Sequence, residues 1–123
     1  MTDKIIALTT CDSQDEARSL ARKLVESRLV ACVNIVSGVE SVYHWQGKVE
    51  TSAEWLLVMK TSRELLQRLK TEISRLHSYT LPELLALPIV DGSEGYLEWL
   101  DRSLLSSEAI VDETPPAGSR ETQ

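Results

Sequence analysis

The side chains best suited to chemistry are few and lie far apart along the 123-residue chain. His77 precedes a turn that Pro82 rigidifies, and Glu83 follows this turn directly. A neutral imidazole and a carboxylate can share a cation, and imidazole suits copper and zinc. Two ligands do not make a metal site, so a third must come from Cys11 or from another subunit. We therefore expect any bound divalent metal to involve His77 and Glu83, with Cys11 as the candidate third ligand.

Each of these residues also has a purely structural alternative. His77 closes a predicted helix, where a positively charged ring suits the negative end of the helix dipole. Cys11 can serve as a small buried hydrophobe, and Cys32 is expected in the core. His44 lies between two aromatic residues near a predicted hairpin tip. That setting favours a packing or interface role for His44 over metal binding.

The sequence contains none of the motifs that mark common catalytic or cofactor sites. GxGxxG, a Walker loop, HExxH and GxSxG are all absent, and the two cysteines form no CxxC pair. We therefore expect no enzyme activity, no organic cofactor, no disulfide scaffold and no zinc ribbon.

Composition indicates one globular domain, which we assign to residues 1–111. The net charge of −6 disfavours nucleic acid and anionic membranes as partners. No apolar run approaches 18 residues and no signal peptide is recognisable, so we expect a cytoplasmic protein. Residues 112–123 are polar and Pro-rich, and we expect a disordered tail there.

Residues 30–61 hold two long runs rich in β-forming residues, joined at Gln46-Gly47. In the second run the odd positions from 49 to 59 are uncharged and alternate with polar ones up to position 54. This period of two predicts a strand with one buried face, and both phases become apolar after Trp55. Gly47 supplies the positive φ of a tight hairpin turn.

The predicted hairpin is longer than a domain of this size is wide. Each arm spans about 45–50 Å if unbroken, against a domain diameter of roughly 35 Å. Either Ser37-Gly38 breaks the first arm, or a bulge forms there and the hairpin overhangs the body. We favour the bulge, with other copies of the chain covering the overhang. The expected contacts in this oligomer are Tyr43, Trp45 and Trp55.

Two helices and two further strands flank this hairpin. A strand over residues 4–10 precedes a helix that a Ser13–Glu16 capping box begins and that ends near residue 27. A second capping box, Thr61–Glu64, predicts a helix over 62–76. A strand over 84–90 follows, placed at a sheet edge or bulge by Pro88, and then a last helix. The order β-α-β-β-α-β-α predicts an α+β, ferredoxin-like split β-α-β fold.

Five segments together resemble the CutA family of divalent-cation tolerance proteins: ACVNI, SVYHWQGKVE, MKT, HSYTLPELLALPI and GYLEWL. The resemblance covers roughly residues 4–105. It implies a cytoplasmic homotrimer, intertwined through the long hairpins and similar in assembly to the PII signalling proteins. It also implies copper tolerance, divalent-metal binding and no established catalysis.

His77 and Glu83 match the family's histidine and its PE glutamate. The family's HPYE reads His77-Ser78-Tyr79-Thr80 here, so one proline and one acidic residue are missing. The first-strand cysteine proposed as a ligand in some members falls near Thr9 or Cys11. The favoured function is a trimeric copper-binding tolerance protein. The alternative is a PII-like module that holds a small anion or metabolite in clefts between subunits.

Overall fold

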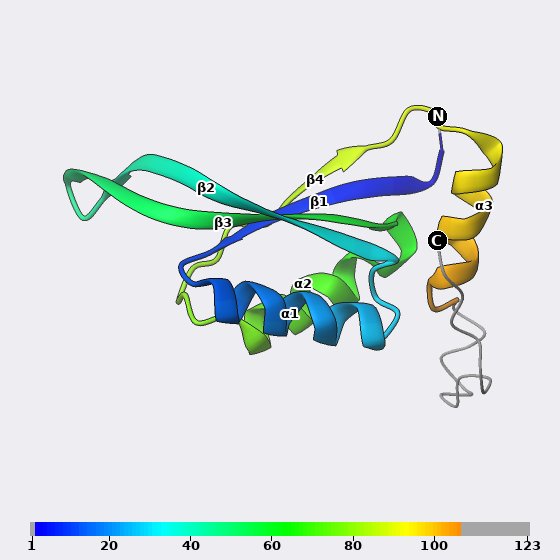
Figure 1. Ribbon diagram of the computed structural model, residues 1–123, viewed down its shortest axis with the longest axis horizontal. Helices are drawn as coiled ribbons and strands as arrows, with labels where there is room; N and C mark the ends of the chain where they lie inside the picture. The colour runs from blue at the N-terminus through cyan, green and yellow to red at the C-terminus, as the bar shows by residue number, and fades with distance from the viewer. Residues whose placement is uncertain (1, 107–123) are drawn as a thin grey trace.

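The computed structural model describes residues 2–106 of the chain (Figure 1). Four strands and three helices follow the predicted order, with a short 3-10 turn before the second helix. Their bounds are β1 Lys4–Cys11, α1 Gln14–Glu26, β2 Cys32–Trp45, β3 Lys48–Ser62, η1 Arg63–Leu65, α2 Leu66–Leu76, β4 Leu85–Pro88 and α3 Glu94–Ser103. The predicted boundary of the disordered tail lies outside the described residues.

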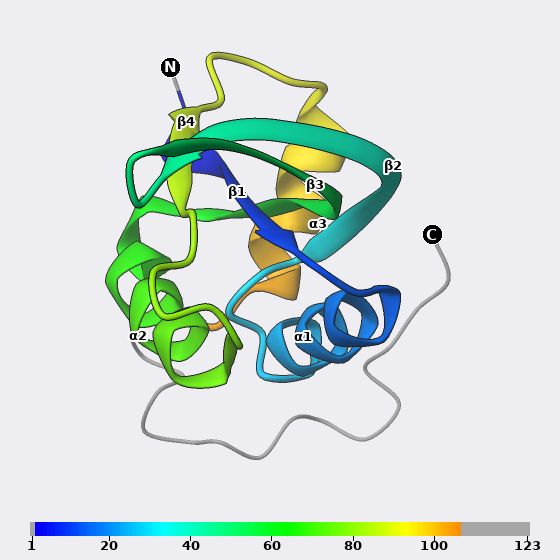
Figure 2. The same ribbon diagram turned by 90° about the vertical axis from the view of Figure 1, so that its left-hand side faces the viewer.

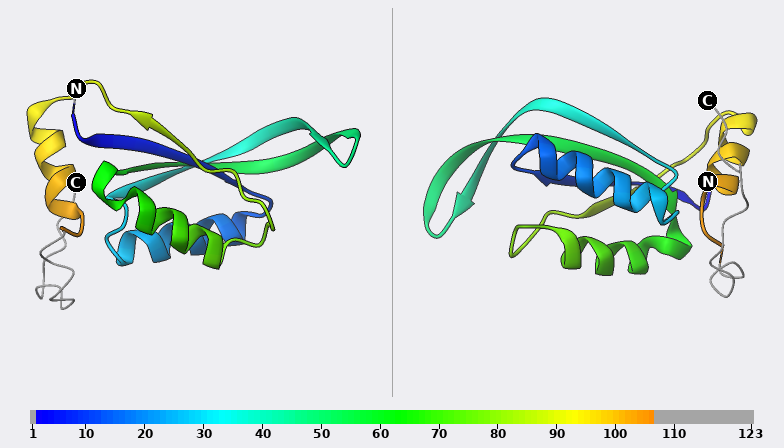
Figure 3. Two further views of the ribbon diagram at one scale, coloured as in Figure 1. Left: turned by 180° about the vertical axis from the view of Figure 1, so that it is seen from behind. Right: turned by 60° about the horizontal axis from the view of Figure 1, so that its bottom comes forward.

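The strands form one sheet in the order β2-β3-β1-β4, and every neighbouring pair is antiparallel. Helices α1 and α2 lie side by side on one face of this sheet, whereas α3 lies at the end where β1 begins (Figure 1, Figure 3). The predicted α+β, ferredoxin-like architecture is confirmed.

The β2–β3 hairpin extends past both helices (Figure 1). Its two-residue turn has φ of 50° at Gln46 and 80° at Gly47. Two positive φ values are typical of a type I′ turn, whose twist matches the flanking strands.

Because the hairpin extends past both helices, its outer half has no helix beneath it, as the length of the two runs predicted.

A bulge interrupts β2 where the sequence predicted it. Val36 pairs with Leu56 and Val39 pairs with Glu54, so two residues of β2 oppose one residue of β3. Gly38 adopts a φ of 75°, which a residue with a side chain rarely adopts. The bulge bends the first arm without breaking it, and pairing resumes as far as the turn.

The predicted burial of the odd positions of β3 holds only near the core. Leu57 and Met59 are fully buried, whereas Val49 is 65% exposed and Glu54 only 7% exposed. In the outer half the prediction is wrong, because the helices end before they reach it. The hairpin curls there, as Figure 2 shows along its length, and Glu54 is covered by the segment after α2. Leu56 remains half-exposed, so only one face near the core is fully covered.

The first predicted capping box is half correct and the second is wrong. The Glu16 amide donates to the Ser13 hydroxyl at 3.1 Å, but the Glu16 carboxylate bonds to Ser78 instead of reaching back. Thr61 belongs to β3, and its hydroxyl donates to the Leu29 carbonyl at 2.7 Å. Thr61 therefore pairs within the sheet as part of β3 and does not cap the helix as the local pattern had predicted.

The last two elements are shorter or less buried than predicted. β4 spans only four residues and pairs with β1 at the sheet edge, with Pro88 as its last residue. In α3, Leu100 is buried but Tyr96 is 42% exposed. Ser93 is the N-cap of α3, yet its side chain makes no capping hydrogen bond.

One cluster of buried side chains joins the sheet to all three helices. The core includes Ala7, Cys11, Ala17, Leu20, Leu24, Leu57, Met59, Leu65, Leu69, Ile73 and Leu100. Cys32, which we expected in the core, is only half-buried, and its Sγ lies 3.7 Å from the Tyr96 hydroxyl.

No helix in residues 2–106 is long and apolar enough to cross a membrane.

Candidate functional site

Two of the three predicted metal ligands are in contact. Cys11 ends β1, and His77 is the C-cap of α2. The Cys11 Sγ lies 3.8 Å from the His77 Nε2, although 66 residues separate the two along the chain. Cys11 is fully buried and His77 is 8% exposed. The fold therefore brings a thiol and an imidazole together inside the protein.

Main-chain groups engage both ring nitrogens of His77. Nε2 lies 2.7 Å from the Thr10 carbonyl, which can only accept, so Nε2 carries the proton. The Tyr79 amide donates to Nδ1 at 3.0 Å, so Nδ1 is unprotonated and the ring is uncharged. The expected alternative of a charged histidine at the helix end is therefore wrong. The ring instead fastens the segment after α2 to the end of β1.

A second link supports the same junction. The Glu16 carboxylate accepts from the Ser78 amide at 2.7 Å and from the Ser78 hydroxyl at 3.0 Å. It lies 3.8 Å from His77 Nδ1, which is beyond hydrogen-bond reach. The amide and hydroxyl of Ser78 are the groups that bind Glu16. This contact ties α1 to the turn after α2.

The Cys11 thiol is held in its protonated form. Burial, reinforced by the negative charges of Glu16, Asp12 and Glu54, raises its pKa to about 12. Metals bind the thiolate form of cysteine. Burial and the nearby carboxylates both disfavour a thiolate at this position. The free thiol is therefore a poor ligand at neutral pH.

Glu83, the third predicted ligand, lies away from this pair. Its main-chain carbonyl accepts from the Thr9 hydroxyl at 2.6 Å, and its exposed carboxylate lines a separate cavity. Within residues 2–106 no group of three or more His, Cys, Asp or Glu side chains is arranged to hold a metal ion. As they stand, the three residues do not fit a bound ion, and the ligand assignment stays a prediction.

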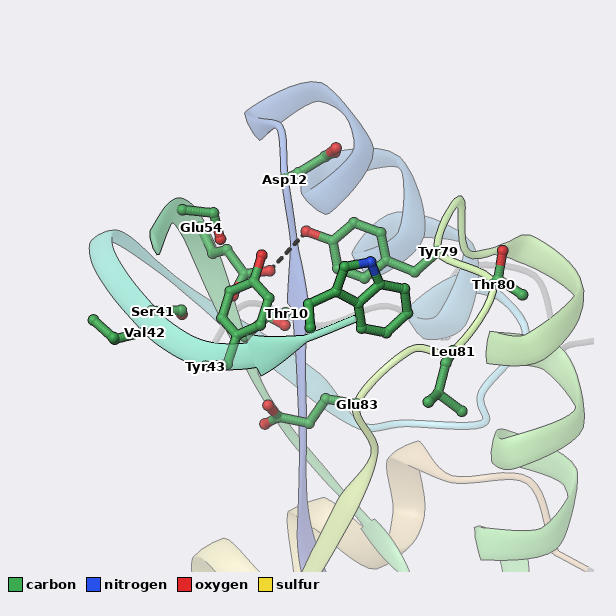
Figure 4. Close-up of a pocket in the computed structure, with 12 residues that line it drawn as sticks. Thr10, Asp12, Ser41, Val42, Tyr43, Glu54, Tyr79, Thr80, Leu81 and Glu83 are labelled. Atoms are coloured by element: carbon green, nitrogen blue, oxygen red, sulfur yellow. Dashed lines mark hydrogen bonds between the residues drawn. The ribbon is translucent and has the colours of Figure 1, made fainter. Parts of the chain in front are cut away.

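The cavity has a volume of about 680 Å³ and lies between the end of β1, the hairpin and the segment that joins α2 to β4. Figure 4 shows the Tyr43, Tyr79 and Glu83 side chains around this opening. No lining residue is basic. The acidic and aromatic members of the lining are Asp12, Tyr43, Trp45, Glu54, Tyr79 and Glu83.

A hydrogen bond between Tyr79 and Glu54 crosses one wall of the cavity. The Tyr79 hydroxyl donates to the Glu54 carboxylate at 2.7 Å (Figure 4). Burial, and then this hydrogen bond to a carboxylate, raises the pKa of Tyr79 well above its usual value. Tyr79 therefore remains a hydrogen-bond donor throughout the physiological pH range.

Sequence reasoning missed Asp12 and Glu54. Glu54 follows the alternating pattern of a solvent face, and no local signal distinguishes it from Glu50. Among the expected oligomer contacts, Tyr43 and Trp45 are 42% and 49% exposed on the hairpin. Trp55 is half-buried and packs against the core of its own chain. No contact between copies is described, so this interface also stays a prediction.

Known proteins resemble this chain in sequence over most of its length. The divalent-cation tolerance protein CutA of Thermus thermophilus is 48% identical over 95 residues, which cover 77% of this chain and 92% of that protein. The protein named CutA, chloroplastic, of Arabidopsis thaliana is 46% identical over 99 residues. This match covers 80% of the present chain and 54% of the plant protein, so the chain spans about half of that relative.

Comparison of structures leads to the same family. The crystal structure of CutA1 from Oryza sativa has a TM-score of 0.83 at 44% identity, covering 85% of this chain and 95% of the rice chain. The family model described as CutA1 divalent ion tolerance protein matches residues 5–103. The chain therefore belongs to the CutA1 divalent ion tolerance protein family.

Proposed function

We propose that this protein is a cytoplasmic homotrimer that binds a divalent metal, with copper the candidate ion, and acts in metal tolerance. Its family is named for divalent-ion tolerance, and this name describes no catalytic reaction. The observation that supports metal involvement is the family match over residues 5–103, since the family is named for divalent-ion tolerance. The contact of Cys11 with His77 adds that two residue types able to ligate copper lie together. The proposal includes no catalytic step and no organic cofactor.

Metal binding at this pair has to overcome the hydrogen bonds described above. Both His77 nitrogens are engaged, and the Cys11 thiol is protonated at neutral pH. The assignment of Cys11, His77 and Glu83 as ligands therefore depends on a binding measurement.

The proposed trimer is supported by apolar surface that a single chain leaves uncovered. Hairpin residues Val42 and Val49 are 64% and 65% exposed, and Leu85 and Leu87 on edge strand β4 are 57% and 49% exposed. Exposed apolar side chains on β-strands mark an association surface or an aggregation risk. Pairing with other copies removes this risk, and sedimentation equilibrium should give three times the 13.8 kDa chain mass.

The proposed location is the cytoplasm. It rests on two unpaired cysteines, which suit a reducing compartment. The Arabidopsis relative carries the name chloroplastic. Fractionation of the source cells with an antibody against the full chain tests this assignment directly.

Anaerobic calorimetry of the full chain with Cu(I), Cu(II) and Zn(II) tests the metal proposal. We expect Cys11→Ser to weaken copper binding at least tenfold, about 1.4 kcal/mol, while the oligomeric state stays unchanged. Cys32→Ser is the matched control, since Cys32 is the other free thiol and its Sγ lies beside the Tyr96 hydroxyl instead of His77. Equal copper affinity in the wild type and in Cys11→Ser would overturn the ligand assignment.

A further inference from the structure

The cavity beside the hairpin is negatively charged from three directions. Asp12 follows β1, Glu54 lies on β3, and Glu83 precedes β4. None of the three carboxylates forms an ion pair within residues 2–106, and no basic side chain lines the cavity. Walls of one charge sign concentrate ligands of the opposite sign. This lining favours a cation and disfavours the small anion considered from the sequence.

The cavity is large enough for an organic ligand. Its volume of about 680 Å³ lies within the range of roughly 300–1,000 Å³ that is typical of organic-ligand sites. A divalent ion needs several donor atoms within about 2.0–2.6 Å. No group of three acidic, histidine or cysteine side chains in the described residues is arranged to provide them. The charge therefore suits a larger, organic cation.

Aromatic rings supply the second feature of such a site. Tyr43 and Trp45 are alternate residues of β2, so their side chains leave the same face of the strand. Tyr79 comes from the segment after α2, and its ring lies near Tyr43 in Figure 4. Aromatic faces attract ammonium groups, and aromatic cages recognise quaternary ammonium ligands. Val42 and Leu81 add apolar surface for the carbon part of a ligand.

We propose that this cavity binds a small organic cation, with an ammonium group among the carboxylates and aromatic rings and an apolar part against Val42 and Leu81. Tyr79 acts as a donor to Glu54 and as a ring wall, and the His77 ring positions Tyr79 through its amide. The inference goes beyond copper binding and does not depend on it. Tyr43 and Trp45 are also expected contacts of the trimer, so the assembled full chain is the form to test.

Choline is a suitable probe, because 3,3-dimethyl-1-butanol has the same shape without the charge. We expect calorimetry or amide chemical shifts to show choline binding at least tenfold tighter than this neutral analogue. Glu83→Gln removes one exposed carboxylate and should weaken choline binding at least fivefold. Glu98→Gln removes an exposed carboxylate of α3, outside the cavity, and should leave binding unchanged.

Equal affinity for choline and its neutral analogue would overturn the proposal, and so would equal loss in Glu83→Gln and Glu98→Gln. No detectable binding of choline to the assembled chain would overturn it as well. The copper proposal fails separately, because Cys11→Ser should reduce copper binding without changing choline binding. Loss of choline binding in Cys11→Ser as well would overturn the independence of the two sites.

Discussion

The Cys11–His77 pair and the cavity beside it share the end of β1, yet they differ in how their polar groups are satisfied. In the pair, the ring nitrogens are engaged by main-chain groups and the thiol is buried. In the cavity, three carboxylates that form no ion pair in the described part of the chain lie beside aromatic rings. The thiol and imidazole, which are typical of metal sites, therefore join segments of the chain, whereas the carboxylates of the cavity remain open to a ligand.

His77→Ala offers the strongest test of this contrast. It leaves the Thr10 carbonyl and the Tyr79 amide without partners in a covered setting, at about 1–3 kcal/mol each. We expect the free energy of unfolding to fall by about 3 kcal/mol in urea at a fixed protein concentration. His77→Gln, which keeps a donor and an acceptor, should recover part of this loss. A loss below about 0.5 kcal/mol would show that the ring does not hold the junction.

The buried thiol predicts a loss of stability at alkaline pH. The pKa of Cys11 is about 12 in the folded chain, against an ordinary value of 9.0. Between these values the unfolded chain releases a proton that the folded chain retains, so the free energy of unfolding falls as pH rises. The expected loss from this thiol is about 1.4 kcal/mol at pH 10.

Cys11→Ala is the control for this alkaline loss. Tyr79 also has a raised pKa and contributes a loss of the same sign above its ordinary value of 10.0. The difference between wild type and Cys11→Ala isolates the thiol, since both retain Tyr79. Parallel stability curves from pH 8 to 10.5 would contradict a buried, protonated Cys11.

The smallest effect on stability is expected in the cavity. The Glu83 carboxylate is exposed and forms no ion pair within residues 2–106, and its main-chain carbonyl accepts a hydrogen bond from Thr9. Glu83→Gln should therefore change the free energy of unfolding by less than about 0.5 kcal/mol. Combined with a loss of choline binding, this result would separate the cavity from the supporting pair. A large loss of stability would place Glu83 with the pair instead.

Much of the fold could be read from local patterns in the sequence. The β-α-β-β-α-β-α order, the turn at Gln46-Gly47 and the bulge at Ser37-Gly38 all depend on residues that neighbour one another in the chain. Periodicity and positive φ at glycine act over a few residues, so a single sequence contains them. The same patterns failed at Thr61, where pairing with a distant strand decided the outcome.

The candidate site was harder to predict from the sequence than the fold, because it depends on which segments the fold places together. The sequence by itself determined that Cys11 and His77 end two regular elements, and it indicated where the hairpin overhangs. Only the tertiary structure decided that the two side chains meet, that the ring is uncharged, and that Glu83 lies apart from them. It likewise decided that Glu54 is buried under Tyr79, since the curl of the hairpin, and not the alternation along β3, sets which face is covered.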